Sequence, residues 1–160
     1  MSTTAQPKAS SESSTAQGSP VRQLTVFLQN RVGALMSLVK LLGDHQVAVL
    51  GLSLQDNTEL ALVRLIVSAP DDAHLLFIEK GIAHSMIPVT VIELKETETS
   101  LPQALSALLG AEINVSFSYP LLIRPGQNPV LVLHLDAPEF GAEVLGKAGF
   151  KVLKQEDLSR

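Results

Sequence analysis

The stretches Ala69-Pro70-Asp71 and Ala137-Pro138-Glu139 decide the fold, because they mark the same point in two copies of one unit. They lie 68 residues apart, and further downstream Gly81-Ile82 is matched by Gly149-Phe150 at the same spacing. Shared turn and helix-boundary residues at a fixed offset indicate an internal duplication.

Upstream of these landmarks the two copies match at other offsets. Ala34-Leu35 aligns with Ala104-Leu105 at an offset of 70, whereas Val47-Ala48-Val49 aligns with Ile113-Asn114-Val115 at 66. We therefore predict that the second copy lacks about one turn at the end of its first helix. Two extra residues then fall within the loop that contains Arg124 to Pro129.

Each copy shows the same order of elements. Alternating apolar residues predict strands, and an apolar stripe at helical spacing predicts a helix that Gly43 ends. Ser68 is expected to cap a second helix that starts at Pro70 and ends at Gly81. In the first copy the strands are expected at 21–28, 47–54, 60–68 and 82–87, and the helices at 35–42 and 70–80.

This order, strand-helix-strand-strand-helix-strand, predicts an α+β protein made of two tandem ferredoxin-like βαββαβ domains. The first domain spans residues 21–88 and the second 89–158, with Pro88 between them. Residues 1–20 hold six Ser and three Thr and few apolar side chains, so we predict a disordered tail.

Composition excludes several functional classes. The 12 basic and 16 acidic side chains give a formal charge of −4, which argues against nucleic-acid binding. The chain has no Cys and its four His show no metal-ligand spacing, so we expect no metal, no cofactor and no catalytic residue. No apolar run is long enough to span a membrane, and a cytoplasmic location fits best.

The third strand of each copy has two apolar faces. Val63, Leu65 and Val67 should lie under the helices, while the opposite face carries Leu62, Arg64 and Ile66. The equivalent opposite face of the second copy holds Val130, Val132 and His134. A sheet with helices on one side normally exposes its other face to water, so this face is expected to be covered by the other repeat or by another chain. A homodimer would account for it.

The turn at 30–33 is the best candidate for a site. It leads into a helix whose first N–H groups are unpaired, and these groups favour a carboxylate. Gly33 would allow a ligand to approach the backbone, and Asn30 offers both a donor and an acceptor. The simpler alternative is a turn that only caps the helix.

The stretch Leu28-Gln29-Asn30-Arg31-Val32-Gly33-Ala34-Leu35, between a strand and a leucine-striped helix, resembles the first motif of the ACT domain. The whole chain from residue 21 onward is similar to small stand-alone tandem ACT proteins, and also to the ACT domain of acetohydroxyacid synthase small subunits. The resemblance implies a bound amino acid or similar effector at this turn, where two domains meet.

The resemblance also suggests the site residues. In the first copy they are Asn30, Val32, Gly33, Ala34, Leu35, Ala48 and Val49; in the second they are Ser100, Gln103 and Asn114. The family often has Asn where this chain has Ala48, and the second copy has Gln103 where Gly is expected. We therefore expect the first turn to accept a carboxylate better, with the second degraded or lending Asn114 to a shared pocket.

The leading hypothesis is a regulatory protein that senses an aliphatic amino acid at the interface of ACT domains, as a homodimer. The alternative is a regulatory subunit of a biosynthetic enzyme such as acetohydroxyacid synthase. An enzyme on this scaffold is disfavoured because no reactive constellation is visible. RNA binding is disfavoured because the third strands lack aromatic residues.

Overall fold

The computed structural model describes residues 18–29 and 31–159. Most of the predicted tail, residues 1–17, lies outside this range, as does Asn30. Among the described residues no helix has the length and apolar character needed to cross a bilayer.

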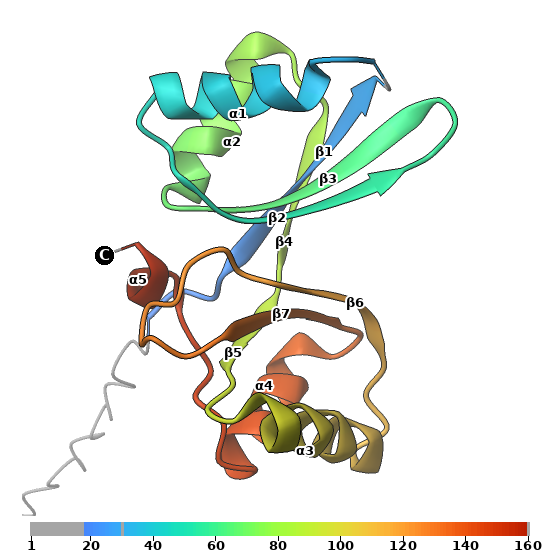
Figure 1. Ribbon diagram of the computed structural model, residues 1–160, viewed down its shortest axis with the longest axis vertical. Helices are drawn as coiled ribbons and strands as arrows, with labels where there is room; N and C mark the ends of the chain where they lie inside the picture. The colour runs from blue at the N-terminus through green and yellow to red at the C-terminus, as the bar shows by residue number, and fades with distance from the viewer. Residues whose placement is uncertain (1–17, 30, 160) are drawn as a thin grey trace, which may run out of the picture.

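The first repeat folds as predicted into one antiparallel sheet with two helices on one face (Figure 1). The strand order is β2-β3-β1-β4. Its elements are β1 (Arg22–Gln29), α1 (Ala34–Asp44), β2 (Val49–Asp56), β3 (Leu60–Val67), α2 (Pro70–Lys80) and β4 (His84–Pro88).

The second repeat has the same topology, with sheet order β5-β7-β6. Its last strand is reduced to a single bridge between Val152 and Ile92, in the place that β4 holds in the first sheet. A short helix then ends the chain. The elements are β5 (Thr90–Glu93), α3 (Thr97–Gly110), β6 (Val115–Pro120), β7 (Val130–Leu135), α4 (Pro138–Lys147) and α5 (Gln155–Leu158).

Strand registers correct the predicted alignment of the two copies. The pairs Leu24↔Leu65 and Thr90↔Leu133 are equivalent, which gives an offset of 66 before the hairpin loop and 68 after it. The first helix follows the offset of 66, since the N–H of Val47 bonds to the carbonyl of Leu42 just as Ile113 bonds to Leu108. The offset of 70 was therefore wrong by about one helical turn; apolar residues four apart lie on the same helix face and can be confused.

Two predicted helix ends also need correction. Gly43 lies within α1, which ends at Asp44, and the chain reverses at Gln46 with a φ of 61°. The Ser68 side chain does not cap α2, because its hydroxyl accepts a hydrogen bond from the N–H of Ala48 at 2.9 Å. Pro70 at the first turn and Gly81 at the left-handed C-terminus, with a φ of 67°, are as predicted.

Each sheet has one hydrophobic core between it and its helices, and a third core lies between the two sheets. Val63, Leu65 and Val67 face α1 and α2, as expected. The third core contains Ile66 from the first sheet and Val130 and Val132 from the second, all almost fully buried. Figure 1 shows the two sheets facing each other, with their helices outermost. The part of each open face around Ile66, Val130 and Val132 is thus covered by the other repeat.

Polar side chains take part in this joint between the sheets. The hydroxyl of Tyr119 donates to Gln23 Oε1 at 2.6 Å, and Gln23 Nε2 donates to Thr25 Oγ1 at 2.9 Å. All three residues are buried. Burial also raises the pKa of the Tyr119 hydroxyl, which therefore stays protonated and able to donate.

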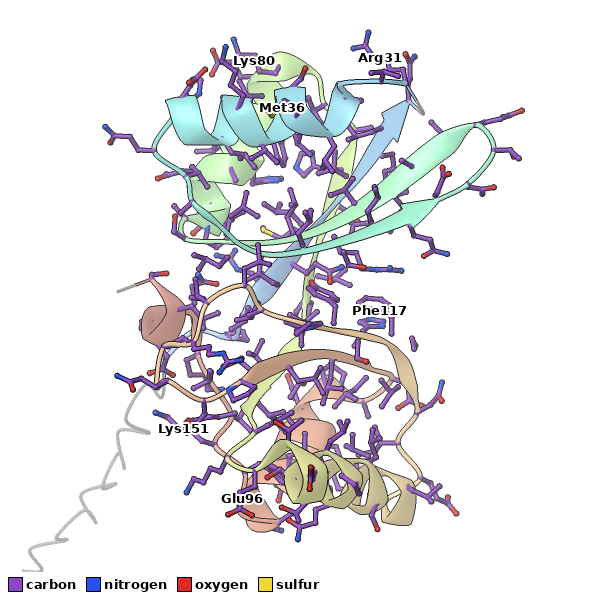
Figure 2. The ribbon with its side chains drawn as sticks, in the orientation of Figure 1. Arg31, Met36, Lys80, Glu96, Phe117 and Lys151 are labelled. Atoms are coloured by element: carbon purple, nitrogen blue, oxygen red, sulfur yellow. The ribbon has the colours of Figure 1, made fainter. Side chains whose placement is uncertain are left out.

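An aromatic stack lies at the side of the joint. The guanidinium of Arg64 lies 3.8 Å from the ring centre of Phe117, and the ring of His134 stacks on Phe117 with centroids 4.7 Å apart. Figure 2 shows Phe117 between the two repeats. Within the described part of the chain, His134 Nδ1 is buried with no hydrogen-bond partner.

The two ends of the described chain are clasped together. The N–H of Ser19 donates to both carboxylate oxygens of Glu156, at 3.0 and 2.9 Å, and the N–H of Gln155 donates to the carbonyl of Ser19. Residues 18–20 therefore belong to the folded part, although the prediction placed them in the tail; residues 1–17 lie outside the described range.

Candidate functional site

The start of α1 has the open backbone that the sequence predicted. Gly33 has a φ of 84°, and a Cβ placed there would meet no atom within 4 Å. Among the described residues, the N–H groups of Val32, Gly33, Leu35 and Met36 have no backbone acceptor. Gly33 at the N-cap has no side chain that could cap the helix. Among the described residues, the positive end of α1 therefore carries N–H donors without a backbone acceptor.

A cavity of about 450 Å³ opens beside this helix start, and we call it the turn cavity. This volume is in the range of about 300–1,000 Å³ typical of small-molecule sites. It lies between the end of β1, one side of α1 and the connection from α2 to β4. Its lining comprises Phe27, Leu28, Gln29, Arg31, Ala34, Ser37, Leu38, Leu41, Gly81, Ile82 and Ala83.

The structure brings together only part of the predicted first site. Ala34 lines the turn cavity, Gly33 lies between two lining residues, and the Val32 side chain is fully exposed next to them. Leu35 packs partly against the core under the sheet. Asn30 lies outside the described residues.

Ala48 and Val49 lie at the other end of the sheet from the turn. Val49 pairs with Val67, whereas Gln29, just before the turn, pairs with Leu60 at the opposite end of β3. Within one repeat these two residues and Gly33 therefore do not form one pocket.

Sequence reasoning missed several lining residues. Gly81, Ile82 and Ala83 come from the α2–β4 connection, far from the turn in sequence. Gly81 was predicted as a helix end, and the βαββαβ topology places the residues after α2 beside β1. These two facts together could have identified the α2–β4 connection as part of the cavity. Ser37 and Leu41 lie on a face of α1 to which the apolar stripe of the sequence assigned no role.

The second repeat has a cavity built from equivalent positions, which we call the small cavity. Its volume is about 140 Å³. Lys95, Ser100, Gln103, Gly149 and Lys151 occupy the places of Gln29, Ala34, Ser37, Gly81 and Ala83. Its full lining is Glu93, Lys95, Ser100, Gln103, Ala148, Gly149, Phe150 and Lys151.

The predicted turn at 100–103 is not a turn, because α3 already begins at Thr97 and includes these residues. Ser100 and Gln103 nevertheless line the small cavity, and Ser100 Oγ accepts a hydrogen bond from the N–H of Glu96. Asn114 lies at the far end of α3, where its N–H bonds to Asp136. It is therefore separated from Ser100, as Ala48 is from Gly33.

Other candidate chemistry finds little support in the described residues. They contain no group of three or more His, Asp, Glu or Cys side chains placed to hold a metal ion. His74 is half-buried, and its Nδ1 lies 2.7 Å from His84 Nε2. The Arg22 guanidinium, 2.9 Å from Asp71, holds the pKa of that exposed carboxyl below its usual range.

Comparisons with known proteins agree with this architecture. A family model described as an ACT domain pair matches residues 19–160. Protein BT0572 from Bacteroides thetaiotaomicron superposes with a TM-score of 0.80 at 22% identity, over 88% of this chain and 96% of that chain. The ligand-free regulatory subunit of aspartate kinase from Thermus thermophilus superposes with a TM-score of 0.56 at 10% identity, over 82% of this chain and 94% of that chain.

These identities are low, so the superpositions show a shared fold alone, and a comparison with curated proteins finds no match. The family model, however, matches nearly the entire chain, including both βαββαβ repeats. The protein therefore belongs to the family of ACT domain pairs.

Proposed function

We propose that this protein is a regulatory module that binds an aliphatic α-amino acid in the turn cavity. The family is regulatory and binds small effectors, which supports the general role. The observation that carries the proposal is the unobstructed backbone at Gly33, beside a cavity of suitable volume. A carboxylate at this helix start would accept hydrogen bonds from the free N–H groups of the turn. It would also face the exposed side chain of Arg31.

The lining favours an aliphatic side chain. Leu28, Leu38, Leu41 and Ile82 contribute apolar surface to the turn cavity, and the lining includes no Asp or Glu. A charged effector side chain would therefore lose its hydration without gaining an opposite charge, apart from that of Arg31. The equivalent small cavity offers less than half the volume and several charges, so we place the effector in the first repeat.

The domain interface that would close this site comes from a second chain. In Figure 2 Arg31 and Met36 lie at the end of the first repeat remote from the second repeat. The apolar side chains of Phe27, Val32 and Met36 are exposed around the turn. A homodimer that buries them would complete the pocket, and an effector with higher affinity for this closed arrangement would stabilise it.

A thermal-shift and calorimetric screen of the twenty amino acids tests the proposal. We expect one or a few aliphatic amino acids to raise the melting temperature of the wild type. Gly33→Val should abolish the part of the shift that arises from the turn cavity, because its side chain fills the approach to the helix start. Gly149→Val is the matched control: Gly149 also has a positive φ, 94°, and open space around it, but lies in the second repeat.

Both variants carry similar backbone strain, so only the loss of the ligand response separates them. If none of the twenty amino acids binds, the proposal is wrong. If Gly33→Val responds like the wild type, the site lies elsewhere.

The second candidate is a regulatory subunit that acts on a biosynthetic enzyme. Exposed Leu75 and Ile78 on α2 favour it, because they form apolar surface outside the turn cavity. Pull-down from lysate tests it: a stoichiometric enzyme subunit supports this role, whereas a clean homodimer favours the effector sensor alone.

A further inference from the structure

A second, chemically different cavity lies where the two repeats meet, and we call it the joint cavity. It measures about 380 Å³. Its walls come from β2 of the first repeat, from the β6–β7 loop and from the C-terminal segment. The lining residues are Leu50, Glu93, Ile123, Arg124, Pro125, Gly126, Lys151, Leu153, Asp157 and Leu158.

The floor of the joint cavity is apolar and rigidly held. Leu50, Leu153 and Leu158 are 7%, 4% and 3% exposed and belong to the core between the sheets. They come from β2 of the first repeat and from the C-terminal segment. A molecule resting on this floor would therefore contact both repeats and the C-terminal helix at once.

The rim carries two cations, Arg124 and Lys151, both largely exposed. Among the described residues, neither has a carboxylate within salt-bridge distance; the ion pairs found are Arg22–Asp71 and Lys147–Glu143. Figure 2 shows Lys151 on the side of the second repeat where the C-terminal helix lies.

The two acidic residues of the rim are already engaged. Glu93 Oε1 accepts a hydrogen bond from the side-chain amide of Asn128. Asp157 Oδ2 accepts the N–H of Lys154 at 2.8 Å, which closes the first turn of α5. These carboxylates thus shape the loop and the helix, and the two cations remain available to an external anion.

The charged rim of the cavity comes from the second repeat and has no counterpart in the first. The β6–β7 loop is two residues longer than its counterpart and folds over Glu93, where Gly126 lies close to the carboxylate. In the first repeat the positions of Glu93 and Lys151 hold Phe27 and Ala83, which carry no charge. Phe27 and Ala83 do line the turn cavity, but Leu50, the β6–β7 loop and Leu158 have no counterpart in its lining, so the joint cavity is not a copy of it.

We propose that the joint cavity binds a small carboxylate with an aliphatic tail. The carboxylate lies between Arg124 and Lys151, and the tail packs on Leu50, Leu153 and Leu158. Either an aliphatic amino acid or an aliphatic acid without the amino group presents this chemistry. Because such a ligand bridges the repeats, its binding stabilises the joint between them.

Titration of the full chain with 4-methylpentanoate and with leucine, followed by methyl NMR, tests the proposal. We expect at least one probe to shift the methyl signals of Leu50, Leu153 and Leu158. The double variant Arg124→Gln/Lys151→Gln should raise the dissociation constant at least tenfold, and added salt should weaken binding to the wild type. The matched control Lys80→Gln/Lys147→Gln removes two exposed charges elsewhere and should bind normally.

The two probes identify the source of the carboxylate. Binding of 4-methylpentanoate alone or more tightly indicates an acid without an amino group, and preference for leucine indicates an amino acid. The proposal fails if neither probe shifts the three leucines, or if the double variant binds as tightly as the wild type. Gly33→Val should retain binding at the joint cavity. The test of the joint cavity therefore remains valid even if the turn cavity binds no effector.

Discussion

The open faces of the two sheets occupy equivalent positions in the duplicated fold, yet they are chemically different. Gln23 and Thr25 on β1 correspond to Val89, just before β5, and to Val91 on β5. Gly51 on β2 corresponds to Phe117 on β6, each next to the same β-bulge. A duplicated domain has thus diverged into two complementary faces while keeping its strand register.

The differences allow the faces to fit together. The buried Gln23 needs a hydrogen-bond partner, and Tyr119 of the second repeat supplies it. The missing side chain at Gly51 leaves room for Leu121, whose Cδ2 would lie 2.5 Å from a Cβ at that position. If both sheets carried the first face, the buried polar side chain of Gln23 would lack the partner that Tyr119 supplies. The contact between the sheets therefore depends on the difference between their faces.

The largest expected effect tests whether this joint makes the repeats one cooperative unit. Leu145 and Phe77 hold equivalent, fully buried positions in the two helix-covered cores. Leu145→Ala should lower the free energy of unfolding by about 2–5 kcal/mol and Phe77→Ala by about 3–5 kcal/mol. In urea unfolding, both variants should move one shared transition. Two separated transitions would show that the repeats unfold independently.

Making the faces more alike at Gly51 should have the next largest effect. Gly51→Val places atoms against Leu121 and Ile66, and should destabilise the protein by about 1–3 kcal/mol. Adding Leu121→Ala should recover part of the loss. Gly110→Ala, a control in α3 with open space around it, should be neutral or stabilising. Equal stability of Gly51→Val and wild type would contradict the close fit described here.

Removing one hydroxyl sharpens the comparison further. Tyr119→Phe leaves Gln23 Oε1 buried without this donor and should cost about 1–3 kcal/mol. Combined with Gln23→Leu, it should cost less than the sum of the single changes, because neither partner then remains unpaired. A double-mutant cycle measured by chemical unfolding provides the check, and strictly additive losses would argue against the bond.

The smallest effect concerns acid. Hydrogen bonds from its own backbone N–H and from Ser19 lower the pKa of the exposed Glu156 carboxyl. A lowered pKa in the folded state stabilises the protein at neutral pH, and this contribution disappears as pH falls through that pKa. Stability should therefore fall slightly less between pH 6 and about pH 3 in Glu156→Gln than in wild type. Identical pH profiles would show that the hydrogen bonds between Ser19 and Glu156 do not contribute to stability.

The topology could be predicted from the sequence because the residues that start and end the second helix are the same in both repeats. Pro70 and Gly81 have counterparts in Pro138 and Gly149, and these residues fix where a helix starts and where the backbone turns left-handed. The alignment of the first helix failed because α3 lacks a glycine at its start. The strand registers and the hydrogen bonds at the helix end reveal the correct equivalence.

The site was harder to predict than the fold. Gly33 could be identified because its conformation is a local property of the turn. The rest of the turn cavity depends on how the α2–β4 connection lies against α1, and local sequence does not contain that distance. The covered sheet face was predicted, but a symmetric dimer and an internal repeat leave the same apolar pattern in one strand.

The clasp between Ser19 and Glu156 brings the two ends of the described chain within hydrogen-bond distance. A short linker could therefore join them, and a circular permutant with new termini between Asn57 and Thr58 should retain both sheets. In such a permutant β2 and β3 would no longer be consecutive in the chain, although they would still pair. Its folding rate, compared with that of the natural order, would report how much the first hairpin contributes to nucleation.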